Sequence, residues 1–170
     1  MNFKFTDTFP EDLNLPSILI SGSDSRKLHN QAYLIIKNDD NSNSLFEIKY
    51  EYHCSPFKEA LIVDSLLAVG YEGYFYLFNV MTNENLLRLE MKGYFGHLYY
   101  DAECFYVTDA GGLYRIDKKA TIHWHNSSLA IDGVIINEFA NNKILGSGEW
   151  DPLGGWRDFV LDRQTGVTLS

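Results

Sequence analysis

Cysteine, positive charge and long apolar runs are all scarce in this chain of 170 residues. Two cysteines, Cys54 and Cys104, are too few for a disulfide framework. Lysine and arginine number 14 against 23 aspartates and glutamates, so the formal charge is −9, opposite to the basic footprint that binds nucleic-acid phosphates. The longest apolar runs span five or six residues, too short to cross a bilayer. We therefore expect no direct nucleic-acid binding and no membrane partner.

The first residues of the chain also lack the apolar stretch of a signal peptide, so a cytoplasmic location is expected. The length fits one domain, 1–170, and an apolar share of 45% is enough to build a packed core. Eleven tyrosines, eleven phenylalanines and three tryptophans favour strands, because stiff flat side chains pack well on a pleated surface. No long apolar stripe has helical spacing, and a single short helical turn is expected at Pro10–Asn14.

Short apolar segments bounded by Gly, Asn, Asp and Ser predict strands along the whole chain, and hence an all-β fold. In the N-terminal part the predicted strands are Ile18–Gly22, Gln31–Lys37 and Leu45–Tyr52. In the remainder they are Ala60–Val63, Ser65–Val69, Tyr74–Val80, Asn85–Met91, Gly96–Asp101, Glu103–Thr108, Gly112–Asp117, Thr121–His125, Gly133–Phe139, Lys143–Ser147, Trp156–Asp162 and Gly166–Leu169.

A repeat of 37 residues organises the second part of the chain. Asp64 closes the strand Ala-Leu-Ile-Val-Asp, Asp101 closes His-Leu-Tyr-Tyr-Asp 37 residues later, and Glu138 closes Val-Ile-Ile-Asn-Glu after another 37. Each unit predicts four short antiparallel strands joined by tight turns. A unit of this size buries its faces only by stacking on neighbours. The predicted repeats are 59–95, 96–131 and 132–170.

The repeat also predicts individual roles. Gly73 and Gly111 occupy hairpin turns where a positive φ is expected, which glycine adopts without steric cost. The aligned apolar positions are expected to lie in the core between stacked sheets. These core positions are Phe75, Leu77, Leu113, Ile116 and Val160.

The segment Val-Thr-Asp-Ala-Gly-Gly-Leu-Tyr-Arg-Ile-Asp-Lys-Lys-Ala-Thr-Ile-His-Trp resembles a blade of a PQQ-type (quinoprotein-like) or WD-like β-propeller. Such blades carry an Asp-Gly hairpin, Leu-Tyr-x-Leu-Asp, a Thr-Gly turn and a strand ending in Trp, and Asp162–Gly166 is similar to the Asp-x-x-Thr-Gly part. The resemblance covers 59–170 and implies a small propeller-like array of about three to four antiparallel four-stranded units. An irregular N-terminal β unit, 18–58, either closes a small ring as the fourth unit or leaves an open twisted sheet or β-sandwich.

Residue types that serve as metal ligands or nucleophiles occur, but their spacing predicts no catalytic or metal site. His123 and His125 share one face of a strand, yet no further ligand is placed beside them and metal sites need three or four. Cys54 and Cys104 have no base and orienting group arranged around them, which favours buried structural thiols. Gly146–Gly148 lacks the spacing and the helix of a nucleophile elbow.

Cofactor and calcium patterns are also incomplete. The loop 38–44 offers oxygen ligands in Asp39, Asp40, Asn41 and Asn43, but it lacks the glycine and distal glutamate of an EF-hand, so a hairpin tip is expected. No glycine-rich phosphate loop precedes a helix, and a ring of four units would be filled by its own side chains, so no cofactor is predicted. A hydrolase hidden in a β scaffold remains the enzyme alternative, without a visible base, nucleophile and oxyanion donor.

An expanded hairpin in the third unit, 149–156, is the strongest functional indication. It contains two tryptophans, two acids and two consecutive glycines, and insertions in a repeat map to loops on one face, often the binding face. The bland alternative is that both tryptophans fold back over the blade edge. Stacked units bring the equivalent turns to one rim, where the tryptophans would anchor a partner. The predicted partner-binding residues are Glu72, Asp109, Glu149, Trp150, Asp151 and Trp156.

The size, the acidity and the lack of catalytic motifs resemble, in kind, the immunity proteins of bacterial contact-dependent growth-inhibition and polymorphic toxin systems. The resemblance implies a non-catalytic protein that binds a basic partner, a cognate toxin nuclease domain, and covers its active site. An acidic surface suits that role because it imitates nucleic-acid phosphates and steers the encounter. The alternative is a stand-alone propeller-like scaffold for another protein partner.

Overall fold

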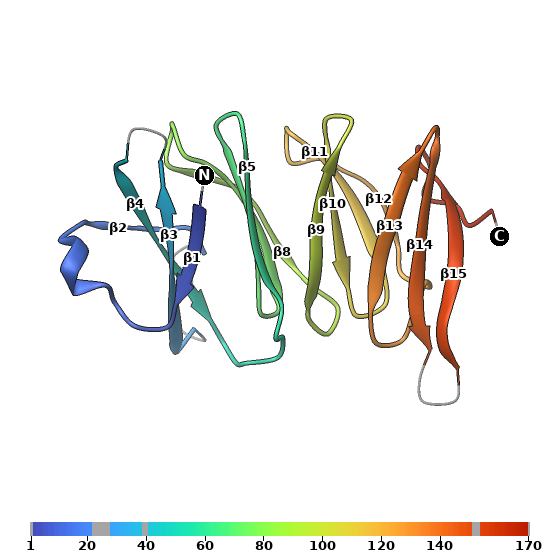
Figure 1. The fold of residues 1–170 in the computed structure, drawn as a ribbon, viewed down its shortest axis with the longest axis horizontal. Helices are drawn as coiled ribbons and strands as arrows, with labels where there is room; N and C mark the ends of the chain where they lie inside the picture. Colours follow the sequence, from blue (N-terminus) through green and yellow to red (C-terminus); the bar gives the residue numbers. More distant parts are fainter. Residues whose placement is uncertain (1, 22–27, 39–40, 151–153, 170) are drawn as a thin grey trace.

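The computed structural model describes residues 2–21, 28–38, 41–150 and 154–169. These residues form four small β-sheets that stand side by side in a row, in chain order from left to right in Figure 1. Each sheet packs an apolar face against the next, so the row is an array of stacked layers. The arrangement confirms the all-β fold that the short apolar segments predicted.

The N-terminal sheet has the strand order β1 (Asn2–Thr6), β3 (Asn30–Lys37), β4 (Asn43–Tyr50) and β2 (Ser17–Leu19). β3 is antiparallel to β1 and β4, whereas β2 runs parallel to β4, so this sheet is mixed and differs from the antiparallel sheets that follow it. The difference arises because the chain crosses the whole sheet between β1 and β2, which occupy opposite edges. β1 is a strand that the sequence pattern did not predict.

The crossing connection covers the outer face of this sheet. It contains η1 (Glu11–Leu13), a single 3-10 turn that confirms the helical turn expected at Pro10–Asn14. η1 lies at the left end of the array in Figure 1, on the side away from the next sheet. Phe9 packs edge-on against Tyr33 of β3, with ring centroids 5.3 Å apart. The first layer therefore has a cover of its own.

The next two sheets are antiparallel meanders of four strands, as the repeat predicted. The first blade consists of β5 (Lys58–Val63), β6 (Leu66–Tyr71), β7 (Tyr74–Asn79) and β8 (Glu84–Glu90). The second blade consists of β9 (Phe95–Asp101), β10 (Cys104–Asp109), β11 (Leu113–Asp117) and β12 (Ile122–Asn126).

The third blade has three strands, β13 (Val134–Ala140), β14 (Lys143–Trp150) and β15 (Gly155–Asp162). A fourth strand at Gly166–Leu169 was predicted, but this segment makes only one isolated bridge, between Leu161 and Thr168. Side chains of the second blade also hold the segment: Trp124 Nε1 donates to Arg163 O at 3.1 Å, and Asn126 Nδ2 donates to Gly166 O at 2.8 Å. The expectation of a complete third blade was therefore wrong.

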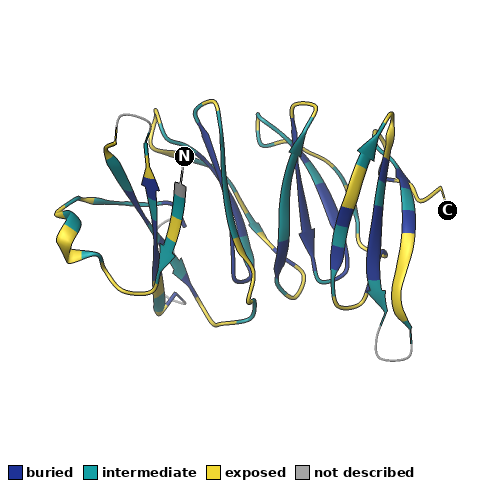
Figure 2. Cartoon of the chain, in the orientation of Figure 1, coloured by how far each residue is buried: buried dark blue, intermediate teal, exposed yellow. Residues whose placement is uncertain are grey.

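The core lies in three apolar layers, one between each pair of neighbouring sheets, which appear as dark blue strand centres in Figure 2. Of the predicted core positions, Phe75, Leu77, Leu113 and Ile116 are fully buried. Val160 is only partly buried, because it pairs with Leu145 on the outer face of the third blade while its neighbour Leu161 points into the core. The assignment of Val160 to the core was wrong.

The hairpin glycines differ from their predicted role. Neither Gly73 nor Gly111 has a positive φ; in the β6–β7 turn Glu72 adopts it, with φ of 51°. The close approach of backbone to a neighbouring layer occurs at Gly70 instead, where a Cβ would overlap the ring of Phe95 from the second blade. The blades are thus pressed together at a position where only glycine fits.

We predict that Leu77→Ala lowers the free energy of unfolding by about 2–5 kcal/mol, because it leaves a cavity in a fully packed layer. Val160→Ala is the matched control and should cost about 1 kcal/mol or less, since the valine is already partly solvated. Urea denaturation of the two variants measures both values. Equal midpoints would contradict the assignment of the layers.

A second pair of substitutions tests the contact between blades. Gly70→Ala should destabilise the fold by about 2 kcal/mol, because the new methyl group forces Phe95 out of its site. Gly73→Ala should change stability by only a few tenths of a kcal/mol, since its Cβ would lie 3.6 Å from Cys54 Sγ and its φ is not positive. Thermal unfolding of both variants separates these outcomes. A larger loss of stability in Gly73→Ala than in Gly70→Ala would support the predicted positive φ at Gly73.

Candidate functional site

The linkers that enter the second and the third blade are each hydrogen-bonded to a hairpin of the preceding blade at one rim of the array. Phe95 N donates to Glu72 O at 2.7 Å, and Gly133 N donates to Ala110 O at 2.8 Å. These linkers lie along the lower edge of Figure 1, beside the lower ends of β14 and β15. Each hairpin between the second and third strands thus supports the linker that follows.

A groove of about 70 Å³ opens at this rim between the second and third blades. Its residues come from three linkers or strand starts and from the β14–β15 hairpin. Aromatic rings form its walls and two carboxylates lie among them. The side chains that define it are Phe57, Tyr94, His97, Asp132, Glu149 and Trp156, and we call it the rim groove.

Gly133 forms the floor of the rim groove. Its φ of 154° falls in the region that favours glycine, and a Cβ there would lie 3.5 Å from Trp156 Cη2 and 3.7 Å from Glu149 Oε2. Tyr94 Oη would be 3.8 Å away. Glu149 and Trp156 are direct cross-strand neighbours, which explains why the acid and the indole share a face. The Trp156 side chain is 51% exposed, so this aromatic surface faces solvent.

Backbone hydrogen bonds hold the floor in place. Ile131 N donates to Glu149 O at 2.8 Å, and Glu149 N donates to Gly133 O at 2.8 Å. Tyr94 Oη donates to the Asp132 carbonyl at 2.6 Å and contacts its carboxylate at 3.2 Å. The linker before β13 is therefore fixed to β14 on one side and to Tyr94 on the other, and the groove is preorganised.

The far wall is built on a hydrogen-bonded contact between the first two blades. His97 Nδ1 lies 2.8 Å from Glu59 Oε1, and Leu98 N donates to the other carboxylate oxygen at 2.8 Å. Phe57 packs on His97 with ring centroids 4.9 Å apart, and on Tyr94 at 6.3 Å. The exposed Phe57 ring is thereby held against the groove instead of moving with the linker.

The electrostatic field of the groove is negative. Burial raises the pKa of the Tyr94 phenol to about 12, and Asp132, Glu149 and Asp109 contribute to the rise because their carboxylates disfavour a phenolate. The same field favours a cation. An aromatic face beside carboxylates is an arrangement that binds ammonium and guanidinium groups.

The size of the groove limits its occupant. Its volume of about 70 Å³ is well below the roughly 300–1,000 Å³ of pockets for small molecules and cofactors. The rim groove therefore suits the head group of a single side chain from a protein partner.

Two predicted surface acids serve the interior instead. Asp109 is fully buried, and its carboxylate accepts hydrogen bonds from the backbone N–H groups of Gly111, Gly112 and Lys92. Glu72 is 5% exposed and accepts from Cys54 N and Ser55 N. Asp109 thus bonds its own turn and the linker before its blade, and Glu72 bonds the linker before its blade. Neither acid lies at the surface, where the sequence had placed both.

The remaining predicted contacts lie near the third-blade hairpin. Glu149 and Trp156 line the rim groove, whereas Trp150 points to the opposite face of the blade with the Arg157 guanidinium 5.5 Å from its ring centroid. Asp151 lies outside the described residues. The partner contact of Glu149, Trp150 and Trp156 remains a prediction.

Sequence reasoning missed Phe57, Tyr94 and Asp132, although a signal was available. Phe57 and Tyr94 are separated by the same 37 residues that separate Asp64 and Asp101. The repeat was applied to strands and hairpins but not to the linkers. An exposed aromatic residue at the same linker position of two units is the pattern that points to this wall.

Other candidate groups are engaged elsewhere. Burial and the neighbouring Glu72 raise the pKa of the Cys54 thiol to about 11, which keeps it protonated and unreactive. His123 contacts Asp117, while His125 stacks on Tyr114 with ring centroids 3.7 Å apart. The described residues contain no group of three or more His, Cys, Asp or Glu placed to hold a metal ion.

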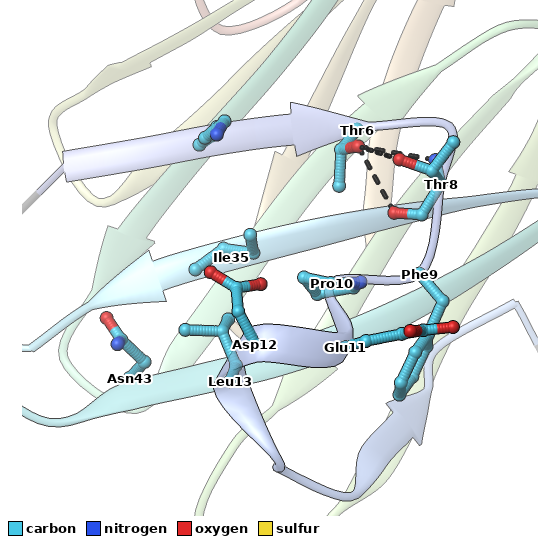
Figure 3. Close-up of a pocket in the computed structure, with 10 residues that line it drawn as sticks. Thr6, Thr8, Phe9, Pro10, Glu11, Asp12, Leu13, Ile35 and Asn43 are labelled. Carbon is cyan, nitrogen blue, oxygen red and sulfur yellow. Dashed lines mark hydrogen bonds between the residues drawn. The ribbon is translucent and has the colours of Figure 1, made fainter.

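A larger hollow, of about 520 Å³, lies between β1 and η1 on the outer face of the N-terminal sheet (Figure 3). Thr6 Oγ1 donates to the Thr8 carbonyl at 3.2 Å on one side, and Glu11 and Asp12 of η1 lie on the other. Lys4 supplies the opposite charge. The mixed charges and scattered hydroxyls do not converge on one point, so we assign no ligand to it.

No helix among the described residues has the length and apolar character needed to cross a membrane. No protein-family model matches the chain, and no curated protein matches it either.

Comparison with solved structures places the fold among β-propellers. The chain is similar to the WD40 domain of Neurospora crassa Pan2, with a TM-score of 0.52, 14% identity, and coverage of 70% of this chain and 38% of that one. It is similar to BamB from Moraxella catarrhalis, with a TM-score of 0.51, 14% identity, and coverage of 92% and 49%. It is also similar to a chain of the mitotic checkpoint complex, with a TM-score of 0.51, 14% identity, and coverage of 98% of this chain and 52% of that one. The chain spans about half the length of these structures or less, and the likeness confirms the propeller-like blades.

We predict that Asp109→Ala lowers the free energy of unfolding by about 3 kcal/mol, because two buried N–H groups and one partly buried N–H group lose their acceptor. Glu149→Gln removes a carboxylate that is partly solvated and should change it by about 0.5 kcal/mol or less. Chemical denaturation of both variants tests the division into an internal and a surface acid. If Asp109→Ala were as stable as the original chain, the internal role assigned to Asp109 would be wrong.

Proposed function

We propose that this chain is a non-catalytic protein-binding module, and specifically an immunity protein that binds a cognate bacterial toxin in the cytoplasm and covers its active site. The observation that carries the proposal is the rim groove, in which the half-exposed Trp156 lies beside Glu149 and Asp132. The proposed partner is a basic nuclease domain. The module needs no cofactor for this activity.

The charge of the chain supports a basic partner. A formal charge of −9 on 170 residues makes encounter with a cationic surface faster, and it opposes binding of the nucleic acid that a nuclease would bind. The acids of the rim, Asp132 and Glu149, take the place of phosphates. Blocking by competition requires only a rigid acidic surface and no chemistry.

The rim groove supplies the short-range part of the contact. A lysine or arginine from the partner would place its charged group over the Trp156 ring and near the Glu149 carboxylate. A cation on an aromatic face contributes about 0.5–2 kcal/mol, depending on how fully water is excluded. Phe57 and Tyr94 line the groove beside the half-exposed Trp156 ring, which places this groove between the two ends of that range.

A non-catalytic role agrees with how the polar groups are used. Ser147 Oγ donates to Asp158 Oδ1 at 2.7 Å and accepts from Asn137 Nδ2 at 3.0 Å, so this hydroxyl belongs to an amide and carboxylate network with no imidazole. The imidazoles of His97 and His123 each contact a carboxylate, that of Glu59 and that of Asp117. These pairings support a structural use of the groups that a hydrolase would need.

We predict that Trp156→Ala weakens the complex with a basic toxin domain by about 2 kcal/mol, mainly through dissociation that is roughly 30-fold faster. The proposal predicts a nuclease toxin domain in the neighbouring gene. That domain is the partner to co-express, and surface plasmon resonance measures the rates. Trp150→Ala is the matched control, since Trp150 lies on the other face with Arg157 over its ring.

Charge reversal tests the electrostatic part. Glu149→Lys combined with Asp132→Lys should slow association, and the effect should fade as salt reduces the screening length below about 8–10 Å. Glu84→Lys changes the net charge at the far end of β8 and should have a smaller effect. An affinity that ignores salt and both groove substitutions rejects this surface. Failure to protect cells from that toxin rejects the immunity function while leaving another protein partner open.

A further inference from the structure

The third blade leaves half of its last strand without a neighbour. In the first blade, β8 pairs with β7 along its whole length, from Tyr74 to Asn79. In the third blade, pairing on the outer edge of β15 is limited to its end, where Asp162 N donates to Val167 O at 2.9 Å and Leu169 N donates to Val160 O at 2.7 Å. The start of β15, yellow in Figure 2, is exposed.

The unpaired half presents a regular row of backbone groups. In a strand, the N–H and C=O of alternate residues point to the same edge. Since Val160 and Asp162 bond outward, Trp156 and Asp158 also direct their backbone groups to that edge. No described residue donates to or accepts from these outward groups. Such an edge is a template for another strand.

A hollow of about 200 Å³ runs beside this edge. Leu129, Trp150 and Phe159 give it apolar walls, and Arg157 lies over the Trp150 ring at its side. Thr168 closes the end nearest to the C-terminal segment. The hollow is on the face of the blade toward which Arg157 and Phe159 point, so side chains of an added strand would enter it at alternate positions.

The opposite face has a different chemistry. Asp158 is exposed, accepts a hydrogen bond from Ser147 Oγ, and forms no ion pair with any described residue. Trp156 presents its half-exposed ring next to it along the edge. A residue paired with either of them would share that face, and a cation fits both a carboxylate and an indole.

We propose that the free edge of β15 accepts an extended segment of a partner protein as the missing fourth strand of the third blade. The segment alternates apolar residues, which enter the hollow, with basic residues, which lie against Asp158 and Trp156. The strand acceptor is a site in its own right and does not depend on the toxin assignment. Strand addition gives affinity through main-chain bonds and selectivity through alternate side chains.

Charge decides between a partner and a second copy of this chain. Two copies joined along β15 would bring together molecules that each carry a formal charge of −9. The cation in the described part of β15 is Arg157, and it points to the face opposite Asp158. A second copy would therefore not supply a cation for Asp158 from β15. A basic segment removes the repulsion and pairs the carboxylate. The occupant is therefore a heterologous basic segment.

The test uses the full chain and an octapeptide of alternating lysine and valine, acetylated and amidated at its ends. Amide hydrogen exchange is followed by NMR. In the free protein, the Trp156 and Asp158 amides should exchange at least about tenfold faster than the Asp162 amide, which is bonded to Val167. Saturating peptide should slow the Trp156 and Asp158 amides by about tenfold and leave Asp162 unchanged.

Matched peptides separate strand pairing from plain charge attraction. N-methylation of the lysines blocks the backbone groups that face β15 and should abolish the protection, whereas N-methylation of the valines should preserve it. A peptide with four lysines followed by four valines, or with glutamate in place of lysine, should bind at least about tenfold more weakly. The proposal would be overturned if these four peptides bound as tightly as the original alternating peptide. It would also be overturned if no peptide protected the Trp156 and Asp158 amides. Self-association through β15 in sedimentation experiments would assign the edge to a second copy instead.

Discussion

Burial of both faces of each small sheet governs the rest of this structure. A sheet of three or four short strands cannot bury two apolar faces by itself, so each must pack against a neighbour. The packing is tight enough that the Phe95 ring occupies the space a side chain at position 70 would need. The spacing of the layers then determines the distance that each linker spans and the hairpin residues that it contacts. The packing of the layers therefore positions the linkers and hairpins that form the rim.

Buried carboxylates complete that rim from the inside. Glu72 and Asp109 accept hydrogen bonds from backbone N–H groups that strands cannot satisfy, and a buried N–H without an acceptor is costly. Asp132 and Glu149 are left at the surface, between rings held by their neighbours. The same residue type therefore supports the linkers at two turns and forms a candidate binding surface at a third. Position in the array, and not acidity alone, decides which role an acid has.

The sequence predicted the strands well because period and turn residues are local signals, and the 37-residue repeat reinforced them. It was less informative where tertiary contacts decide. Glu72 and Asp109 lie in the interior and not at the predicted surface, because they bond to the backbone of linkers distant in sequence. The last predicted strand was wrong because Trp124 and Asn126 of another blade hold that segment. At the groove, two of its residues were predicted, whereas the aromatic wall was missed because the 37-residue repeat was followed in the strands and hairpins and not in the linkers.

The cover over the N-terminal sheet gives the array a direction. Phe9 and η1 occupy the face on which a further blade would have to stack, while the outer face of the third blade carries the partly buried Leu145 and Val160 without such a cover. A repeat architecture of this kind can be lengthened only at its uncovered end, as in other stacks that have one finished terminus. A blade added by protein engineering after β15 would thus find an uncovered face to pack on, whereas one added before β1 would not. Duplication of a 37-residue unit during evolution would meet the same one-way rule.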